Sequence, residues 1–387
     1  MRKQADSSSH PAWARWSQAA AERPWTVGIE EDVMLLDGLT WSVANRIDDV
    51  ITALPIDVAA RVAAETHACV IELRTSPHVT VAGAAAELSL MRETLGRVLR
   101  EELGLCAAAA GTHPLAIRSE VAVSTGPHYR EVEATMRALV HREPTMALHV
   151  HVAVPDGQAA VRALDGLRGD LPLLLALSAN SPYWRSRDSG FASIRTPIFS
   201  MFPRVGIPRH FGSFAEYVHV VEELLLAQAV PDPGFLWWDA RIQPRLGTVE
   251  VRIMDSQSRV ADVAGLAAVI QCLVRGHAEA RHPRVVGPEA LAENRFLAAR
   301  DGMCAAVIEA GTGRRRPMRE ALSELLTACR PVAAGLGCSG ELAHAPTLAD
   351  EPGYARQRRL AADHGLTALP ALLGEEFAPA RMTAVAV

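Results

Sequence analysis

Four short segments of this chain alternate between apolar side chains and side chains that carry a charge or an imidazole: residues 27–33, 70–74, 148–152 and 249–253. Successive side chains of a β-strand point to opposite faces, so each segment predicts a strand with one apolar and one polar face. Such strands predict an antiparallel sheet that packs on helices and leaves its polar face open. The polar pairs at strand spacing are Glu30 with Asp32, Glu72 with Arg74, His149 with His151, and Glu250 with Arg252.

These polar faces carry groups that bind ligands. Carboxylates crowded on one face repel one another unless a cation neutralises them. Carboxylate and imidazole groups are ligands for Mg²⁺ or Mn²⁺, and arginine on the same face binds phosphate or carboxylate through paired hydrogen bonds. The ordinary alternative is a solvated face, which many antiparallel sheets have. The absence of lysine, glutamine and threonine from these pairs favours ligand binding.

Two glutamates do not follow the alternation. Glu31 falls on the apolar face by parity, so we expect it to lie beyond the helical cover or to pair with an arginine there. Glu65 lies seven residues before Glu72, which would put the two on opposite faces of a regular strand. A loop or bulge between them would let both side chains converge.

The chain outside these strands is largely helical by its pattern. Helices are predicted at residues 82–103, 130–141, 214–229 and 260–280, and an aromatic loop at 181–210 is too long to be a simple connection. No linker interrupts the middle of the chain, so we predict a single α+β catalytic domain over residues 25–375. Its motifs lie in 26–280 and a helical cover in 281–375, between flexible tails at 1–24 and 376–387.

Composition narrows the chemistry further. The chain has one lysine, Lys3, and 38 arginines, so a Schiff-base lysine and a P-loop lysine are absent from the predicted core. Phosphate must therefore be bound by arginine, backbone N–H groups or metal. The net charge of −5 gives no general attraction to nucleic acid or to an anionic membrane. The most apolar run, residues 171–177, is too short to span a bilayer.

The cysteines and the N-terminus indicate a compartment. The six cysteines form no CxxC pair, which is typical of reduced thiols. The first residues lack the apolar core of a secretory signal. We expect a cytoplasmic protein that acts on small molecules, with neither nucleic acid nor membrane as a partner.

Several motifs together resemble the glutamate–cysteine ligase type 2 family, in particular its bacterial carboxylate–amine ligases. The resemblance spans about residues 26–280, and each motif is weak alone, whereas their order and spacing are specific. The motifs are Gly28-Ile-Glu-Glu-Asp, Glu65-Thr-His, Ile71-Glu-Leu-Arg-Thr, Gly111-Thr-His-Pro, His149-Val-His-Val, Leu177-Ser-Ala-Asn-Ser-Pro-Tyr, Phe191-Ala-Ser-Ile-Arg, Ile198-Phe-Ser-Met-Phe-Pro, Trp238-Asp-Ala-Arg and Gly247-Thr-Val-Glu-Val-Arg-Ile-Met-Asp.

The resemblance implies a glutamine-synthetase-like core, in which a curved antiparallel sheet forms an active-site funnel with helices on its outer face. Such enzymes bind ATP with Mg²⁺ or Mn²⁺, phosphorylate a carboxylate and let an amine displace the phosphate. The implied product is an amide or γ-glutamyl peptide, with glutamate as the expected carboxylate donor. The family also implies a homodimer or higher homo-oligomer.

The resemblance assigns roles to individual residues. Metal binding falls to Glu30, Asp32, Glu65, Glu72, His149, His151 and Glu250, with His151 either a ligand or a residue that orients one. Nucleotide binding falls to Glu30, Asp32, Glu250 and Arg252, and catalysis to Arg252, Arg195 and Arg241. The family more often has glutamate where this chain has Asp32, which leaves the number of metals open.

Alternative functions stay open at this point. A metal-dependent amide hydrolase would use the same glutamate and histidine face, and it would act without nucleotide. A non-catalytic descendant would bind metal or nucleotide only. The sequence leaves the amine open, with cysteine as one possibility, and it gives no role for the C-terminal helical part.

Overall fold

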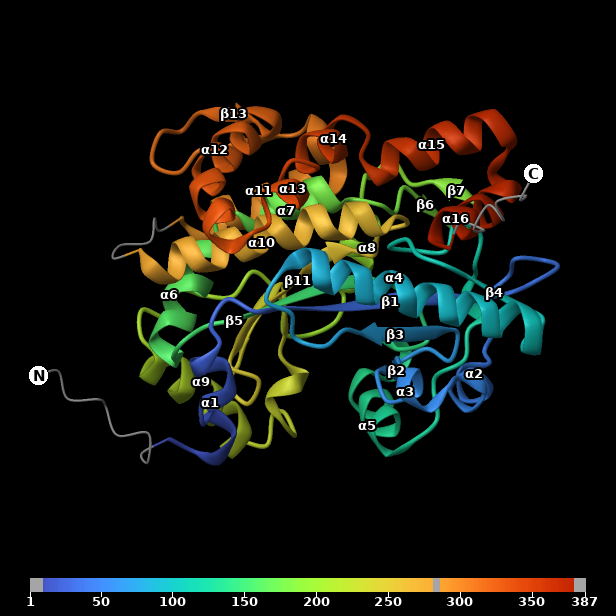
Figure 1. Cartoon of the computed structure of the whole chain (residues 1–387), viewed down its shortest axis with the longest axis horizontal. Coiled ribbons are helices and arrows are strands. Elements are labelled where there is room, and N and C mark those ends of the chain that lie inside the picture. The colour runs from blue at the N-terminus through green and yellow to red at the C-terminus, as the bar shows by residue number, and fades with distance from the viewer. Residues whose placement is uncertain (1–9, 281–285, 379–387) are drawn as a thin grey trace, which may run out of the picture.

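An open antiparallel sheet runs through the middle of the molecule (Figure 1). The structure is a computed structural model that describes residues 10–280 and 286–378. The strand order is β10, β11, β5, β1, β3 and β2, and β4 pairs with the far end of β1. These strands are β1 (Val27–Asp37), β2 (Val62–Ala64), β3 (Val70–Arg74), β4 (Leu105–Ala108), β5 (Ala147–Ala153), β10 (Ala240–Gln243) and β11 (Thr248–Asp255). The predicted α+β class and the antiparallel sheet are confirmed.

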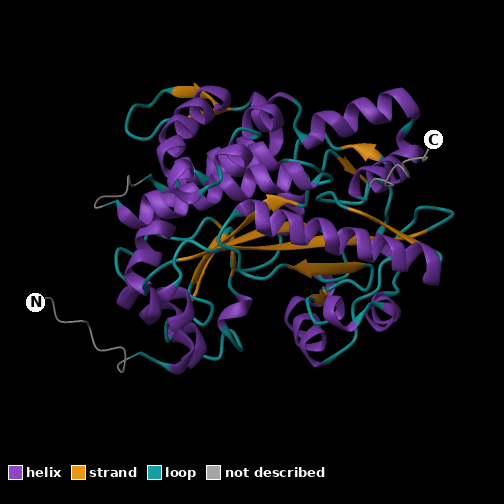
Figure 2. Ribbon diagram, in the orientation of Figure 1, coloured by secondary structure: helices purple, strands orange, loops and turns teal. Residues whose placement is uncertain are grey.

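Helices α4 and α10 and the C-terminal helices cover the back of this sheet. Figure 2 shows them on one side of the strands, and a smaller group of helices on the other side. The helices are α1 (Gln18–Glu22), α2 (Ile47–Ala53), α3 (Ile56–Ala59), α4 (Val81–Val98), α5 (Pro127–Met136), α6 (Gly157–Leu167), α7 (Leu171–Ser178), α8 (Arg195–Phe199), α9 (Phe214–Leu226), α10 (Val260–Glu279), α11 (Pro288–Asp301), α12 (Met318–Leu336), α13 (Ser339–Leu342), α14 (Ala345–Asp350), α15 (Gly353–His364) and α16 (Leu369–Phe377).

Within the described ranges, six further short strands lie outside the main sheet. They form three two-stranded pairs, of which the β8–β9 pair is parallel. These strands are β6 (Tyr183–Trp184), β7 (Arg187–Asp188), β8 (Val205–Gly206), β9 (Trp237–Trp238), β12 (Ala306–Ile308) and β13 (Arg315–Pro317). Two of the pairs, β6–β7 and β8–β9, take strands from the predicted aromatic loop, so that loop is ordered.

The apolar face of β1 forms part of the main core. Ile29, Val33 and Leu35 are buried there. Glu31 shares this face and is fully buried, and it pairs with Arg92 of α4 through two hydrogen bonds. Of the two expectations for Glu31, pairing with an arginine is confirmed, because α4 supplies a guanidinium to balance the buried charge.

The predicted N-terminal tail is wrong for residues 10–24. This segment forms a short 3₁₀ turn, η2 (Ala12–Ala14), and α1. The indole of Trp16 donates a hydrogen bond to the Val154 carbonyl at 3.1 Å. The segment is held because its tryptophans pack on the sheet and on α9, which a local pattern does not reveal.

The predicted C-terminal tail is wrong for its first residues. α16 continues through Phe377, and Glu376 accepts a hydrogen bond from the buried Arg356 at 3.1 Å. This ion pair and the burial of Phe377 extend the helix past residue 375. Residues 1–9 and 379–387 of the predicted tails, and residues 281–285 of the predicted cover, lie outside the described residues.

One described helix, α10, is long and apolar enough by composition to cross a membrane. It lies inside the protein, and 72% of its apolar window is buried. It contacts α4, α6, α12 and α13, so its apolar composition is accounted for by its position in the core.

Candidate active site

Antiparallel pairing brings the polar faces of the predicted strands together. Glu30 lies opposite His149 between β1 and β5, and Asp32 lies opposite Glu72 between β1 and β3. The pairing of β5 with β11 sets His151 opposite Glu250. We call this side of the sheet the front face, defined by Glu30, Asp32, Glu72, His149, His151, Glu250 and Arg252.

All seven predicted metal ligands lie close together on or beside the front face. They form three overlapping groups of three residues. Within each group, the donor atoms lie within 4.8 Å of one another. The groups are Glu30 with His151 and Glu250, Glu30 with Glu72 and His149, and Asp32 with Glu65 and Glu72. Glu65 joins them because it lies in the turn between β2 and β3, so the expectation that a loop brings Glu65 to Glu72 is confirmed.

Nearby arginines balance the acidic group of Asp32, Glu65 and Glu72 only in part, because burial and mutual repulsion dominate. Burial, and then the nearby Glu65, raises the pKa of Asp32 well above its usual value. Burial, and then Glu30 and Glu65, likewise raises the pKa of Glu72. The cation nearest Glu72 is Arg74, whose Nε lies 3.4 Å from a Glu72 carboxylate oxygen and whose side chain is half exposed. Several ionised carboxylates in this space therefore favour a bound cation.

The imidazoles differ in protonation. Burial, and then Arg252, lowers the pKa of His149 to about 4, so its ring is neutral near pH 7. Burial opposes protonation of His151 too, but Glu30 and Glu250 raise its pKa above the usual value. Burial opposes ionisation of Glu30, yet His151 and His149 lower its pKa. A neutral His149 beside an ionised Glu30 is a suitable pair of metal ligands.

Glu250 is placed differently from the other acids. It is fully buried, and one of its oxygens accepts hydrogen bonds from Arg241 at 2.6 Å and Gln243 at 2.8 Å. The other oxygen pairs with Arg252. Burial opposes ionisation, but Arg241 and then Arg252 hold its pKa well below the usual value. Glu250 thus fixes the two arginines on the front face.

The third predicted arginine, Arg195, enters from α8. Its guanidinium is buried and donates to the carbonyl oxygen of Ile253 at 3.2 Å. Asp255 lies 3.9 Å away, and burial lowers the pKa of Arg195. Its Nε has no hydrogen-bond partner among the described residues, so a donor remains free.

A cavity of about 360 Å³, which we call the front cavity, opens over the front face. Phe199 and Phe202, from the predicted aromatic loop, form part of its wall, whereas Phe211, directly after that loop, packs in the core. Its charged lining residues are Glu30, Asp32, Glu65, Glu72, Arg195, Arg241 and Arg252. All three predicted catalytic arginines therefore reach one cavity.

A second cavity of about 440 Å³, the side cavity, meets the site at Glu30 and His151. Its charged lining residues are Glu30, Arg23, Arg74 and Arg245. Glu30 lines both cavities, so the two flank one carboxylate. His151 and Glu250 do not line the front cavity, although both contact groups that do.

Sequence reasoning missed several lining residues. His128, Val132 and Met136 come from α5, and Trp237 from β9. Gln243 donates a hydrogen bond to Glu250 from β10, where it alternates with apolar residues, but it belongs to none of the motifs. Arg23 and Arg245 lie outside the four strand patterns, so only their place in the fold reveals them.

The fold is that of known ligases. The structure matches a glutamate–cysteine ligase from Francisella tularensis solved with AMP, with a TM-score of 0.66, 12% identity and coverage of 92% of this chain and 90% of that chain. It matches a bifunctional glutathione synthetase from Pasteurella multocida with a TM-score of 0.67, 14% identity and coverage of 93% and 53%. At these identities the likeness concerns the fold.

Sequence comparison then identifies the family. The profile of glutamate-cysteine ligase family 2 matches residues 26–370. A Rubrobacter xylanophilus protein named "Putative glutamate--cysteine ligase 2-3" is 38% identical over 347 residues, covering 89% of this chain and 94% of the relative. A Nocardia farcinica protein named "Putative glutamate--cysteine ligase 2-2" is 34% identical over 348 residues, covering 87% and 91%. The chain belongs to this family, and it is an enzyme of the carboxylate–amine ligase class.

Proposed function

We propose that this enzyme uses ATP to phosphorylate a carboxylate, with glutamate as the donor, and joins the activated acyl group to an amine. The observation that supports this most is the pair of cavities that meet at Glu30. Phosphoryl transfer needs the attacking and leaving oxygens roughly in line with the phosphorus. Two cavities that share one lining carboxylate suit a phosphoryl donor and an acceptor that meet beside it.

The charges of the two cavities assign their ligands. The side cavity is lined by three arginines and one carboxylate, which favours the negatively charged triphosphate. The front cavity is lined by four carboxylates and three arginines. Its acids together suit a divalent cation and the ammonium group of an amino acid, and its arginines suit a carboxylate. We therefore assign ATP to the side cavity and both other substrates to the front cavity.

The donor set fits Mg²⁺ or Mn²⁺. Asp32, Glu65 and Glu72 offer oxygens alone, and Glu30 with His149 offers a carboxylate and a neutral imidazole. Glu250 is held by Arg241 and Arg252, so we propose it mainly as the residue that positions them. A bound divalent cation supplies neutralisation of phosphate charge during transfer.

The arginines stabilise the anionic groups. A substrate carboxylate oxygen attacks the γ-phosphorus, the bond to the β-phosphate oxygen breaks, and ADP leaves. The amine then attacks the acyl carbon, phosphate leaves with the bonding pair, and the amine loses a proton. We assign Arg252 and Arg241 to the transferred phosphoryl group and Arg195 to the substrate carboxylate. Each donates charge-assisted hydrogen bonds.

The aromatic wall protects the intermediate. Phe199 and Phe202 lie with their rings 5.5 Å apart, and Phe202 lies 6.3 Å from Trp237. These half-buried rings line the front cavity beside Arg195 and Arg252. Acyl phosphates hydrolyse in water, so an apolar wall here favours transfer to the amine.

The test measures ADP release with Mg²⁺ or Mn²⁺ against a panel of carboxylates and amines, beginning with glutamate and cysteine. We expect ADP release to require both substrates and to match the amide found by mass spectrometry. ADP release that is independent of every acceptor, or no release at all, contradicts the proposal. Cleavage of amides without nucleotide would instead identify a metal-dependent hydrolase. A homo-oligomeric state and a cytoplasmic location complete the proposal.

A further inference from the structure

The N-terminal segment, residues 10–24, helps to form the side cavity. Four of the residues that line this cavity, Ser17, Ala19, Ala20 and Arg23, belong to it. All four precede residue 26, where the family profile begins to match. The segment is thus a part of this chain's site that the family match does not cover.

The segment is fixed in place by contacts with distant parts of the chain. The backbone N–H of Ser17 donates to the Pro244 carbonyl at 3.0 Å, and Trp25 N–H donates to the Ala153 carbonyl at 2.8 Å. Gly247 has a φ of +69°, and a Cβ on it would lie 2.3 Å from the Cβ of Ala20. Only glycine allows α1 to lie this close to the turn between β10 and β11.

Arg23 and Arg245 bring free positive charge to this cavity. Arg23 follows α1 and Arg245 lies in the turn before β11, and both side chains are exposed. Among the described residues, neither guanidinium makes an ion pair or a hydrogen bond. Most other arginines near the site are paired, as Arg241 and Arg252 are with Glu250. The hydroxyl groups of Ser17 and Thr26 line the cavity beside them.

We propose that the N-terminal segment is the outer wall of the nucleotide site and that Arg23, together with Arg245, binds the phosphates of ATP. This inference rests on the proposed function, which assigns ATP to the side cavity. Two unpaired guanidinium groups from segments more than 200 residues apart converge on a cavity that Glu30 also lines. Phosphate oxygens supply the acceptors that both lack.

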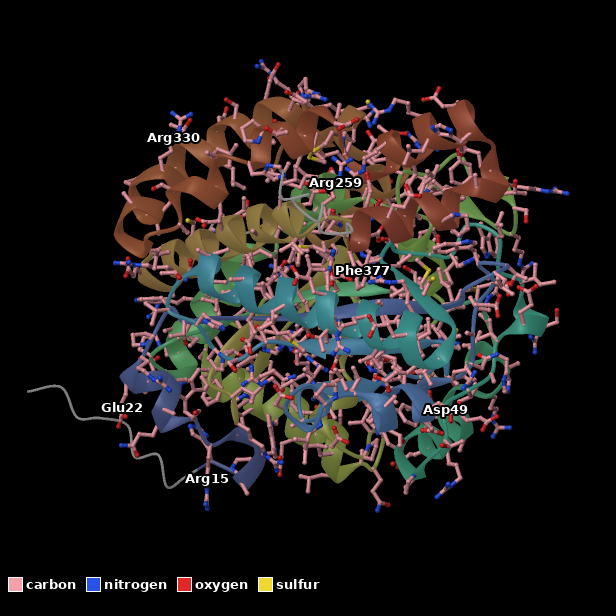
Figure 3. The ribbon with its side chains drawn as sticks, turned by 45° about the vertical axis from the view of Figure 1, so that its right-hand side comes forward. Arg15, Glu22, Asp49, Arg259, Arg330 and Phe377 are labelled. Carbon is pink, nitrogen blue, oxygen red and sulfur yellow. The ribbon has the colours of Figure 1, made fainter. Side chains whose placement is uncertain are left out.

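The test measures the dissociation constant of ATP with Mg²⁺ by calorimetry, without carboxylate or amine. We expect Arg23→Ala to weaken binding about tenfold, because a hydrogen bond to a charged group is lost. Arg245→Ala should weaken it by a similar factor, and Arg23→Lys should restore most of the affinity by keeping the charge. The matched control is Arg15→Ala, since Arg15 lies exposed at the outside of the molecule on the same segment (Figure 3) and does not line the cavity.

The outcomes separate this inference from the proposed function. If the wild type binds ATP and Arg23→Ala binds it equally well, the inference is wrong whatever the turnover assay shows. If Arg15→Ala loses as much affinity as Arg23→Ala, the segment acts through its fold, and the contact with phosphate is refuted. If the wild type binds ATP and Arg23→Ala weakens it but no carboxylate is activated, the inference stands and the ligase reaction fails. A wild type that does not bind ATP contradicts both.

Discussion

The two faces of β1 give neighbouring acidic residues, Glu31 and Asp32, opposite surroundings. On the back, Glu31 is fully buried against Arg92, whose Nε donates to it at 2.8 Å. Arg92 also donates a second hydrogen bond to Glu31, and its other N–H groups donate to backbone carbonyls, among them those of Ser258 and Gln257 at 2.8 and 2.7 Å. On the front, Asp32 accepts one hydrogen bond from the backbone of Ala147 and lies beside Glu65. No arginine among the described residues forms an ion pair with it, although the charges of Arg195 and Arg252 act on it.

The difference shows where this fold supplies its own counter-charge. The back pair is complete within the protein and stabilises the contact between sheet and helix. The front group carries more negative charge than the protein balances, which is costly for stability and useful for binding a cation. The predictions below test this contrast from the largest expected effect to the smallest.

Removal of Arg92 should have the largest effect. Arg92→Ala leaves Glu31 charged and buried without a partner, and we expect it to lower the free energy of unfolding by about 3–5 kcal/mol. The measurement is denaturant unfolding followed by circular dichroism. The control is Arg97→Ala on the same helix, whose side chain is 49% exposed and should cost less than about 1 kcal/mol. Equal losses in the two variants would show that the Arg92–Glu31 pair stabilises the fold no more than an exposed arginine does.

Neutralisation of Glu72 should have the opposite effect: it should reduce turnover without reducing the stability of the fold. Glu72→Gln keeps the shape of the side chain, and we expect at least about a hundredfold loss of turnover, near 2.7 kcal/mol. The free energy of unfolding without metal should stay equal or rise, because one repelling charge is lost. Near-normal turnover in this variant would show that catalysis does not require Glu72.

The pH dependence follows from the raised pKa values of Asp32 and Glu72. The native protein holds these protons more tightly than the unfolded chain does, so their stabilising contribution is present at low pH. It is lost as pH rises from about 4 through the raised native values. Without divalent cations, Glu72→Gln should therefore gain stability relative to wild type between pH 5 and pH 8. Added Mn²⁺ should raise the wild-type melting temperature at pH 8 more than that of the variant.

The smallest effect concerns the aromatic wall. Phe202→Ala opens the front cavity to water, and we expect release of ADP without amide to rise about two- to fivefold. Phe296→Ala is the control, because Phe296 is 44% exposed and does not line the cavity. The measurement is the ratio of ADP released to amide formed. An unchanged ratio would show that Phe202 only packs against its neighbours and does not protect the intermediate from water.

The sequence predicted the front face because its signal is local. Alternation within single strands places Glu30 with Asp32 and Glu250 with Arg252, and antiparallel pairing then brings those strands together. The side cavity was not predictable in this way. It depends on Trp16 reaching Val154, 138 residues away, and on the turn at Gly247 accepting α1. Contacts of this kind leave no periodic pattern in either segment.

The role of Glu250 shows the same limit. Its parity and motif marked it as a polar residue of the front face, and the metal role assigned to it stays a prediction. Its partners Arg241 and Gln243 come from β10. Because of them, both carboxylate oxygens of Glu250 already accept hydrogen bonds from the protein. A strand pattern gives the face of a residue, whereas the neighbouring strand determines what that residue binds.

The most direct test of the central claim follows the substrate oxygen. Once a carboxylate substrate is found, it is labelled with ¹⁸O in the reacting carboxyl group, and the phosphate released is examined by mass spectrometry. Activation through an acyl phosphate predicts that one labelled oxygen passes from the carboxylate to phosphate in each turnover. Amide formation with unlabelled phosphate would contradict the account.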